Sequence, residues 1–197
     1  MDQTLLFGLV SFAFVTSITP GPNNLMLMAS GAHFGYRRTI PHVMGINLGF
    51  LSLVLAAGFG MAALLLALPA AKTALKLAAV AYMLWLAWKI AHAAPPGGAA
   101  KAGQPMSLVQ AAGFQWVNPK AWAMALGAVS AYGQGGDIGA VLAVGAVFCL
   151  VNIPSVSTWV LAGEVMRRIL TNPRRLAVYN WTMASLLVLS LWPVVQF

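Results

Sequence analysis

The sequence predicts an all-α integral membrane protein: six transmembrane helices in two inverted three-helix repeats, the first and fourth helices broken at mid-membrane. Of the 197 residues, 60% are hydrophobic and only 7% are charged, whereas about a quarter of a soluble domain is charged. The chain divides into six apolar stretches, and about 20 helical residues cross a bilayer. Two of these stretches contain prolines near their middles. Each observation indicates a membrane-embedded bundle and excludes a soluble enzyme.

The six apolar stretches cover approximately residues 4–35, 40–68, 70–92, 107–132, 138–163 and 176–196. Each should be a helix, because backbone polar groups inside a bilayer must be satisfied within the segment. We therefore expect one transmembrane domain over residues 1–197. Its first repeat is expected at about 1–94, a Pro/Gly-rich linker at 95–105, and its second repeat at about 106–197.

The basic residues predict the orientation. Of the eleven, ten lie in loops or near helix ends, and alternate loops hold eight against two. The larger set should face the cytoplasm, which places both chain ends on the periplasmic side. Loop charge also explains the net charge of +8, so no nucleic-acid partner is expected. The N-terminus has no basic region before its apolar run, so the first stretch is interpreted as a retained helix rather than a signal peptide.

The first stretch is predicted to break at Thr19-Pro20-Gly21-Pro22-Asn23-Asn24. Two prolines remove amide donors, and the glycine between them loosens the backbone. In the fourth stretch, Asn118-Pro119-Lys120 combines a favoured N-cap with a favoured first helical residue, so a new half-helix should begin at Pro119. Each break lies near the midpoint between flanking charges, Asp2 and Arg37 or Lys101 and Asp137, so both are expected at the bilayer midplane.

Broken helices at corresponding positions of two inverted halves indicate the substrate site of a transporter. The segments after Pro22 and Pro119 would both present N-terminal amides at the midplane, and such amides suit a carboxylate. The alternative is that these prolines only kink ordinary membrane helices. The spacings Gly31-x-x-x-Gly35 and Gly45-x-x-x-Gly49 are further hints of close helix packing.

Lys120 is the one basic residue near the middle of an apolar stretch. A lysine there costs about 2.5–3.5 kcal/mol on insertion scales, so it should have a partner. We expect that partner to be a substrate carboxylate or the carbonyls exposed at the first break; the alternative is that Lys120 snorkels or only ties the break together. Asn47 and Asn152 add amides at membrane depth, where interhelical bonding is the simpler interpretation. The helix is expected to be distorted at Asn152-Ile153-Pro154. The substrate-binding candidates are Pro20, Gly21, Pro22, Asn23, Asn24, Asn47, Asn118, Pro119, Lys120 and Asn152.

No cofactor, metal site or catalytic centre is expected. Cys149 is the single cysteine, the sequence has no HExxH motif, and its three histidines fall near the cytoplasmic ends. An intramembrane enzyme would need a nucleophile with a base, or paired acids, at membrane depth. A channel or scaffold subunit without coupling is the stronger alternative to a transporter. Expected partners are an amino-acid substrate, membrane lipid and protons, and two copies could pair as a homodimer through an apolar face.

Several motifs together resemble the LysE/RhtB superfamily of bacterial amino-acid exporters. They are Thr19-Pro20-Gly21-Pro22-Asn23-Asn24, Gly35-Tyr36-Arg37-Arg38, Tyr82-Met83-Leu84-Trp85-Leu86-Ala87-Trp88-Lys89 and Asn118-Pro119-Lys120. The resemblance covers essentially the whole chain and is strongest to the cysteine/O-acetylserine exporter branch. It implies six helices in the inner membrane and proton-driven, secondary-active efflux of amino acids or close derivatives by alternating access.

The resemblance also bears on the substrate and on coupling. Branches that export basic amino acids are expected to carry an acid near the signature, and here Asn23 and Asn24 occupy that place. A neutral amino acid is therefore favoured. A coupling proton would need Lys120, a terminal acid such as Glu164, or the substrate's own titration, and these alternatives stay open.

Overall fold

The computed structural model describes residues 1–61, 69–93, 104–170 and 172–192, and within these ranges every regular element is a helix. The elements are α1 (Gln3–Ile18), α2 (Pro22–Phe34), α3 (Tyr36–Gly58), α5 (Pro69–Ala91), α6 (Leu108–Val117), α7 (Pro119–Tyr132), the short 3-10 helix η1 (Gln134–Gly136), α8 (Ile138–Ile169) and α9 (Pro173–Leu189). The predicted all-α class is confirmed. Most of the predicted linker lies outside the described residues.

The helices follow the six predicted stretches. The first stretch is α1 plus α2 and the fourth is α6 plus α7, so both predicted breaks are present. Each remaining stretch carries one helix. The α8 helix continues through Pro154 without interruption, so the distortion expected there does not amount to a break.

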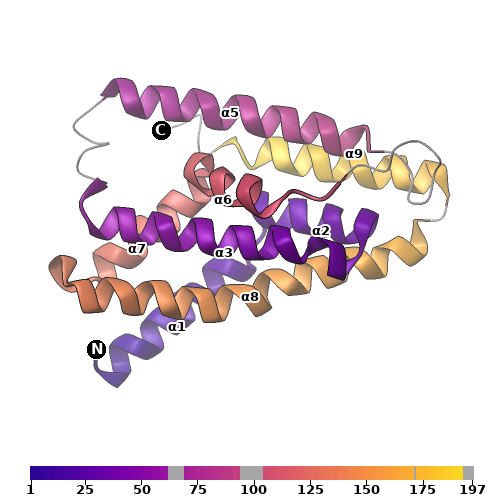
Figure 1. The fold of residues 1–197 in the computed structure, drawn as a ribbon. Coiled ribbons are helices and arrows are strands. Elements are labelled where there is room, and N and C mark those ends of the chain that lie inside the picture. The colour runs from indigo at the N-terminus through magenta and orange to yellow at the C-terminus, as the bar shows by residue number, and fades with distance from the viewer. Residues whose placement is uncertain (62–68, 94–103, 171, 193–197) are drawn as a thin grey trace.

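Three of these helices are long and apolar enough to cross a membrane, over Tyr36–Gly58, Thr73–Ala91 and Ile138–Ile169. The pair α1 and α2, bent by 55°, gives a fourth crossing if counted as one span. Successive segments run back and forth along the long axis of the molecule (Figure 1), with the α2–α3 and α8–α9 junctions at one end. The N-terminus and the α7–α8 junction lie at the opposite end.

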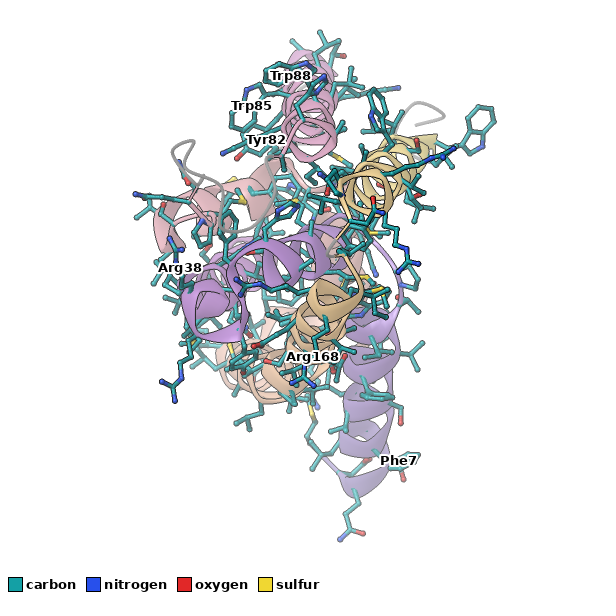
Figure 2. All side chains as sticks on the ribbon, turned by 90° about the vertical axis from the view of Figure 1, so that its right-hand side faces the viewer. Phe7, Arg38, Tyr82, Trp85, Trp88 and Arg168 are labelled. Atoms are coloured by element: carbon teal, nitrogen blue, oxygen red, sulfur yellow. The ribbon has the colours of Figure 1, made fainter. Side chains whose placement is uncertain are left out.

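The helices form layers. The α5 and α9 helices pack together on one side, and α1 projects on the other (Figures 1 and 2). Only the stripe Leu9, Ala13 and Ser17 of α1 is buried, whereas Phe7 and other apolar side chains along the helix are exposed. This distribution of buried and exposed side chains suits a helix that contacts the other helices along one stripe and lipid elsewhere.

The two largest apolar clusters are divided at the helix breaks. One joins α2 and α6 to α5 and α9, and the other joins α1 and α7 to α3 and α8. Each broken stretch therefore contributes one half to each cluster. The polar residues of the breaks therefore lie between the two apolar clusters.

Glycines bring two pairs of helices into backbone contact. A Cβ on Gly31 would collide with Val160 O of α8, and one on Gly163 would collide with Met28 O of α2. Similarly, Gly45 and Gly49 of α3 meet the α6 backbone. The packing expected at Gly31, Gly45 and Gly49 is thus confirmed. Gly35 instead ends α2 with a φ of 79°, a conformation that favours glycine.

Candidate functional site

The chain between α1 and α2 exposes carbonyls that have lost their helical partners, and side chains from other positions satisfy them. Asn24 Nδ2 donates to Ser17 O and to Thr19 O, both at 2.8 Å. Trp159 of α8 donates its indole N–H to Ile18 O at 3.0 Å. The first break is therefore a fixed structure held from two helices.

The second break is a capped helix start. Asn118 has an extended backbone, and its Oδ1 accepts a hydrogen bond from the backbone N–H of Lys120 at 3.1 Å. Pro119 occupies the first helical position, where its missing N–H and fixed φ are tolerated. Both roles were predicted from the sequence.

Lys120 connects the two breaks. Its Nζ donates to Thr19 O at 2.7 Å, Thr19 Oγ1 at 2.9 Å and Pro20 O at 3.3 Å. The contact with first-break carbonyls is one of the two partners expected for this residue. Gly21 makes room for it, since a Cβ at that position would lie 2.7 Å from Lys120 Cδ.

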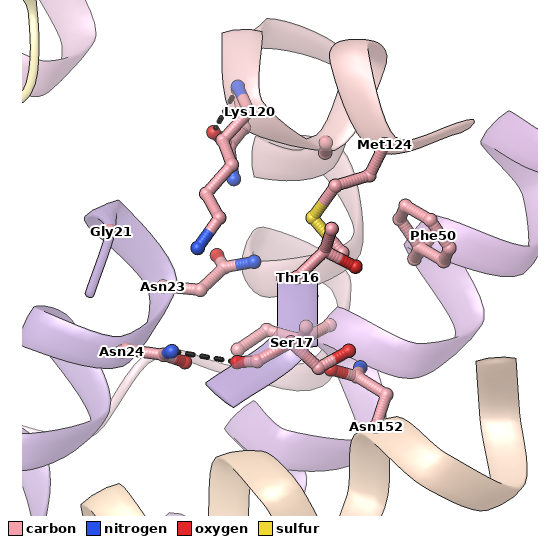
Figure 3. A pocket seen from close by; sticks show the side chains of 12 residues that line it. Thr16, Ser17, Gly21, Asn23, Asn24, Phe50, Lys120, Met124 and Asn152 are labelled. Atoms are coloured by element: carbon pink, nitrogen blue, oxygen red, sulfur yellow. Dashed lines mark hydrogen bonds between the residues drawn. The ribbon is translucent and has the colours of Figure 1, made fainter. Parts of the chain in front are cut away.

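A cavity of about 30 Å³ lies between the breaks (Figure 3). It is lined by Thr16, Ser17, Gly21, Asn23, Asn24, Ile46, Phe50, Asn118, Lys120, Ala121, Met124 and Asn152. Such a volume holds a water molecule but is smaller than an amino acid. The helices therefore lie close together around the breaks in this structure, and an amino acid would fit the cavity only if they separated.

The start of α2 is electrostatically distinct. Side chains cap the starts of α1, α6, α7, α8 and α9, and Glu164 Oε2 accepts a hydrogen bond from Tyr36 N at the start of α3. By contrast, within the described residues no side chain caps α2. Helix geometry leaves the backbone N–H groups of Asn23 and Asn24 without intrahelical acceptors, and both residues line the cavity. An uncapped helix start is suited to binding an anion.

Most of the predicted site residues come together here. Gly21, Asn23, Asn24, Asn118, Lys120 and Asn152 line the cavity. Asn47 lies behind it and accepts a hydrogen bond from Asn152 Nδ2 at 3.2 Å. The three prolines are placed differently. Pro22 and Pro119 are the first residues of α2 and α7, whereas Pro20 offers its carbonyl to Lys120.

Several polar residues at this site were not singled out from the sequence. Gln115 of α6 exchanges two hydrogen bonds with Asn23, at 2.8 and 3.1 Å. Ser17 lines the cavity with a buried hydroxyl that has no hydrogen-bond partner in the described part of the chain. Gln115 is completely buried and lies three residues before Asn118 in an otherwise apolar stretch, a signal that could have identified it. Nothing distinguishes Ser17 from other membrane serines in the sequence.

No metal site is visible in the described ranges, where no three His, Cys, Asp or Glu side chains gather closely enough to hold an ion. In addition, no carboxylate lines the cavity. Its chemistry is therefore that of amide, hydroxyl and ammonium groups next to the apolar side chains of Ile46, Phe50 and Met124.

The model of one protein family, the LysE type translocator, matches residues 14–190, a range that includes both breaks and the whole cavity lining. This chain belongs to the LysE type translocator family. The resemblance found in the motifs is thereby confirmed.

Curated relatives agree with this membership. Cysteine/O-acetylserine efflux proteins from Escherichia coli (strain K12) and Shigella sonnei (strain Ss046) are each 30% identical to this translocator over 171 residues. Each alignment covers 86% of this chain and 87% of the relative. No solved structure matches the chain.

Proposed function

We propose that this translocator is a secondary-active exporter of a small, neutral amino acid or amino-acid derivative across the bacterial inner membrane. Its family and the efflux proteins that it resembles support export as the activity. The cavity between the helix breaks supports the substrate class, because it joins charge-binding groups to a small apolar surface.

The observation that carries the proposal is the uncapped start of α2 beside Lys120. A substrate carboxylate would bind the backbone N–H groups of Asn23 and Asn24, where the dipole of α2 favours negative charge. Lys120 would supply the full positive charge. With Asn23, Asn24 and Asn152 in the lining in place of acids, a neutral side chain fits better than a second cationic group.

The proposed topology is six crossings in two inverted repeats, with both chain ends in the periplasm. The alternating directions of the six segments support it, as does the position of α2 and α7 after the breaks of the first and fourth stretches. The end with the α2–α3 and α8–α9 junctions contains Arg37, Arg38, Arg167, Arg168, Arg174 and Arg175. This end would face the cytoplasm.

Transport would proceed by alternating access and be coupled to protons. The narrow cavity supports alternating access, because it has room for water but not for an amino acid, so a substrate would need the breaks to separate. A coupling proton would be carried by Lys120, by Glu164 of α8, which accepts a hydrogen bond from the start of α3, or by the substrate. Of the two protein groups, only Lys120 lines the cavity.

Counterflow in proteoliposomes tests the proposal. Vesicles with purified protein are loaded with one unlabelled amino acid at a time. Uptake of the same amino acid in labelled form is then followed with and without an imposed pH gradient. We expect saturable counterflow of a small neutral amino acid, accelerated by the gradient, and its loss in Lys120→Met. Linear, non-saturable flux would indicate a channel. No flux with any amino acid, or unchanged affinity in Lys120→Met, would overturn the substrate assignment.

A further inference from the structure

The ammonium group of Lys120 occupies a binding site made of oxygen atoms. Its partners are Thr19 O at 2.7 Å, Thr19 Oγ1 at 2.9 Å and Pro20 O at 3.3 Å. An ammonium group has three N–H donors and no acceptor, so three oxygens match its full donor set. Both carbonyls follow the carboxyl end of α1, where the helix dipole adds partial negative charge.

Neighbouring carbonyls of the same break are satisfied without Lys120. Asn24 holds Ser17 O and also Thr19 O, and Trp159 holds Ile18 O. These donors are neutral and belong to packed helices, whereas Lys120 reaches the break on a flexible stem. The ammonium group can therefore leave the three oxygens while the rest of the break keeps its hydrogen bonds.

The α-ammonium group of an amino acid has the same chemistry as the lysine head group. A transported zwitterion needs acceptors for that group, and no carboxylate lines the cavity in the described residues. The three oxygens held by Lys120 are a ready acceptor set beside the start of α2. Thr19 and Pro20 are exposed residues beside Gly21 and Lys120, both of which line the cavity.

We propose that Thr19 O, Thr19 Oγ1 and Pro20 O form a binding site for a primary ammonium group, which Lys120 occupies until the substrate's α-ammonium group replaces it. The inference rests on the proposed function. While it is bound to these oxygens, Lys120 Nζ already lies 3.1 Å from the position a Gly21 Cβ would take, so a short movement of its flexible stem keeps it next to the start of α2. There it pairs with the substrate carboxylate. When the substrate leaves, Lys120 returns to the three oxygens.

Chemical rescue tests this site without any transport assay. Lys120→Ala removes atoms equivalent to propylammonium, and the full-length variant is purified in detergent and titrated with that ion. Tetramethylammonium, which has no N–H donor, is the control at equal ionic strength. We expect propylammonium to raise the thermal midpoint of Lys120→Ala saturably, at concentrations at least tenfold lower than those that affect the wild type. Tetramethylammonium should have no such effect.

Lys120→Met with the ammonium ion is the second variant, because the methionine side chain ends where lysine Cε does and leaves room only for the nitrogen. If either variant aggregates, its monodisperse recovery during solubilisation in its matching ion, but not in tetramethylammonium, is the equivalent readout. Equal responses to the two kinds of ion, or equal responses of variant and wild type, would overturn the proposal.

The outcome is separable from the counterflow test. Rescue by propylammonium with no amino-acid counterflow would keep the ammonium site and remove the exporter assignment. Counterflow without rescue would keep the exporter and remove the role of Lys120 as an occupant of the site.

Discussion

At the residue scale, Ser17 has a buried hydroxyl for which the described part of the chain provides no partner. Its Oγ is inaccessible and unbonded among the described residues, although the side chain lines the cavity. A buried polar atom without a partner costs folding free energy, so it usually has another use. Its position between Asn24 and Asn152 (Figure 3) suggests that the use is contact with the transported molecule.

Removing this hydroxyl should lower the affinity for the transported amino acid without lowering the thermal stability of the protein. We expect Ser17→Ala to keep or slightly raise the thermal midpoint, because no hydrogen bond is lost. It should weaken the apparent affinity in counterflow by about 2- to 10-fold, the value of one net hydrogen bond. Thr16→Val is the matched control, since Thr16 also lines the cavity but bonds to Phe12 O of its own helix. A loss of stability in Ser17→Ala without any change in affinity would contradict this role.

Side chains with strong local preferences were predictable from the sequence, and long-range pairs were not. Asn118 and Pro119 carry their capping roles in the local pattern, and the cost of burying Lys120 required a partner. The exchange of hydrogen bonds between Asn23 and Gln115 joins positions 92 residues apart. Only the tertiary fold, which places both α2 and α6 against α3, brings those two amides together.

At the scale of elements, the contact between α2 and α8 depends on two glycines that face each other's helix. Gly31 lies against Val160 O and Gly163 against Met28 O. Membrane helices have little hydrophobic driving force to associate, so close backbone packing of this kind supplies much of their attraction.

Gly163→Ala should therefore destabilise the protein. The added methyl group meets the α2 backbone, which cannot rotate away like a side chain, so the free energy of unfolding should fall by about 1–3 kcal/mol. Unfolding in mixed micelles measures it. Gly113→Ala in α6 is the control, because a Cβ there has no atom within 4 Å. A change of equal size in both variants would mean that helix propensity rather than packing is responsible.

The sequence identified half of this contact. Gly31 belongs to a small-residue spacing that indicates close packing, and the structure confirms it. Gly163 has no partner at such a spacing among 19 glycines. Its importance depends on which helix lies opposite, which is a property of the tertiary fold.

At the scale of the whole molecule, the six apolar stretches could be predicted from composition and from the positions of charged residues, glycines and prolines. Apolar length and flanking charges predict their number and order, because a bilayer requires about 20 helical residues for a crossing; in the described residues three helices, or four with the bent pair, meet that requirement. The division into two apolar clusters separated at the breaks was not visible in the sequence, since each cluster mixes helices from both halves of the chain.

Topology can be tested with little engineering because Cys149 is the only cysteine. In a Cys149→Ser background, Gln3→Cys and His92→Cys place one thiol at an exposed position near each end of the bundle. We expect a membrane-impermeant maleimide to label Gln3→Cys in spheroplasts, and to label His92→Cys only after permeabilisation. The reverse pattern would invert the proposed orientation, and labelling of both from outside would exclude it.

The glycine contacts between α2 and α8 also have a mechanical consequence. At Gly31 and Gly163 the two backbones meet with no side chain between them, so sliding one helix along the other would break these contacts, and we expect the pair to move together. The α1 helix is held by a single buried stripe and meets α2 at a 55° bend. If α1 tilts relative to that pair, we expect the change to occur at residues 19–21, where the two helical segments meet. The oxygens that hold the Lys120 ammonium group lie in this segment, so we expect an exchange of the ion bound there to be felt first as a change in the angle between α1 and α2.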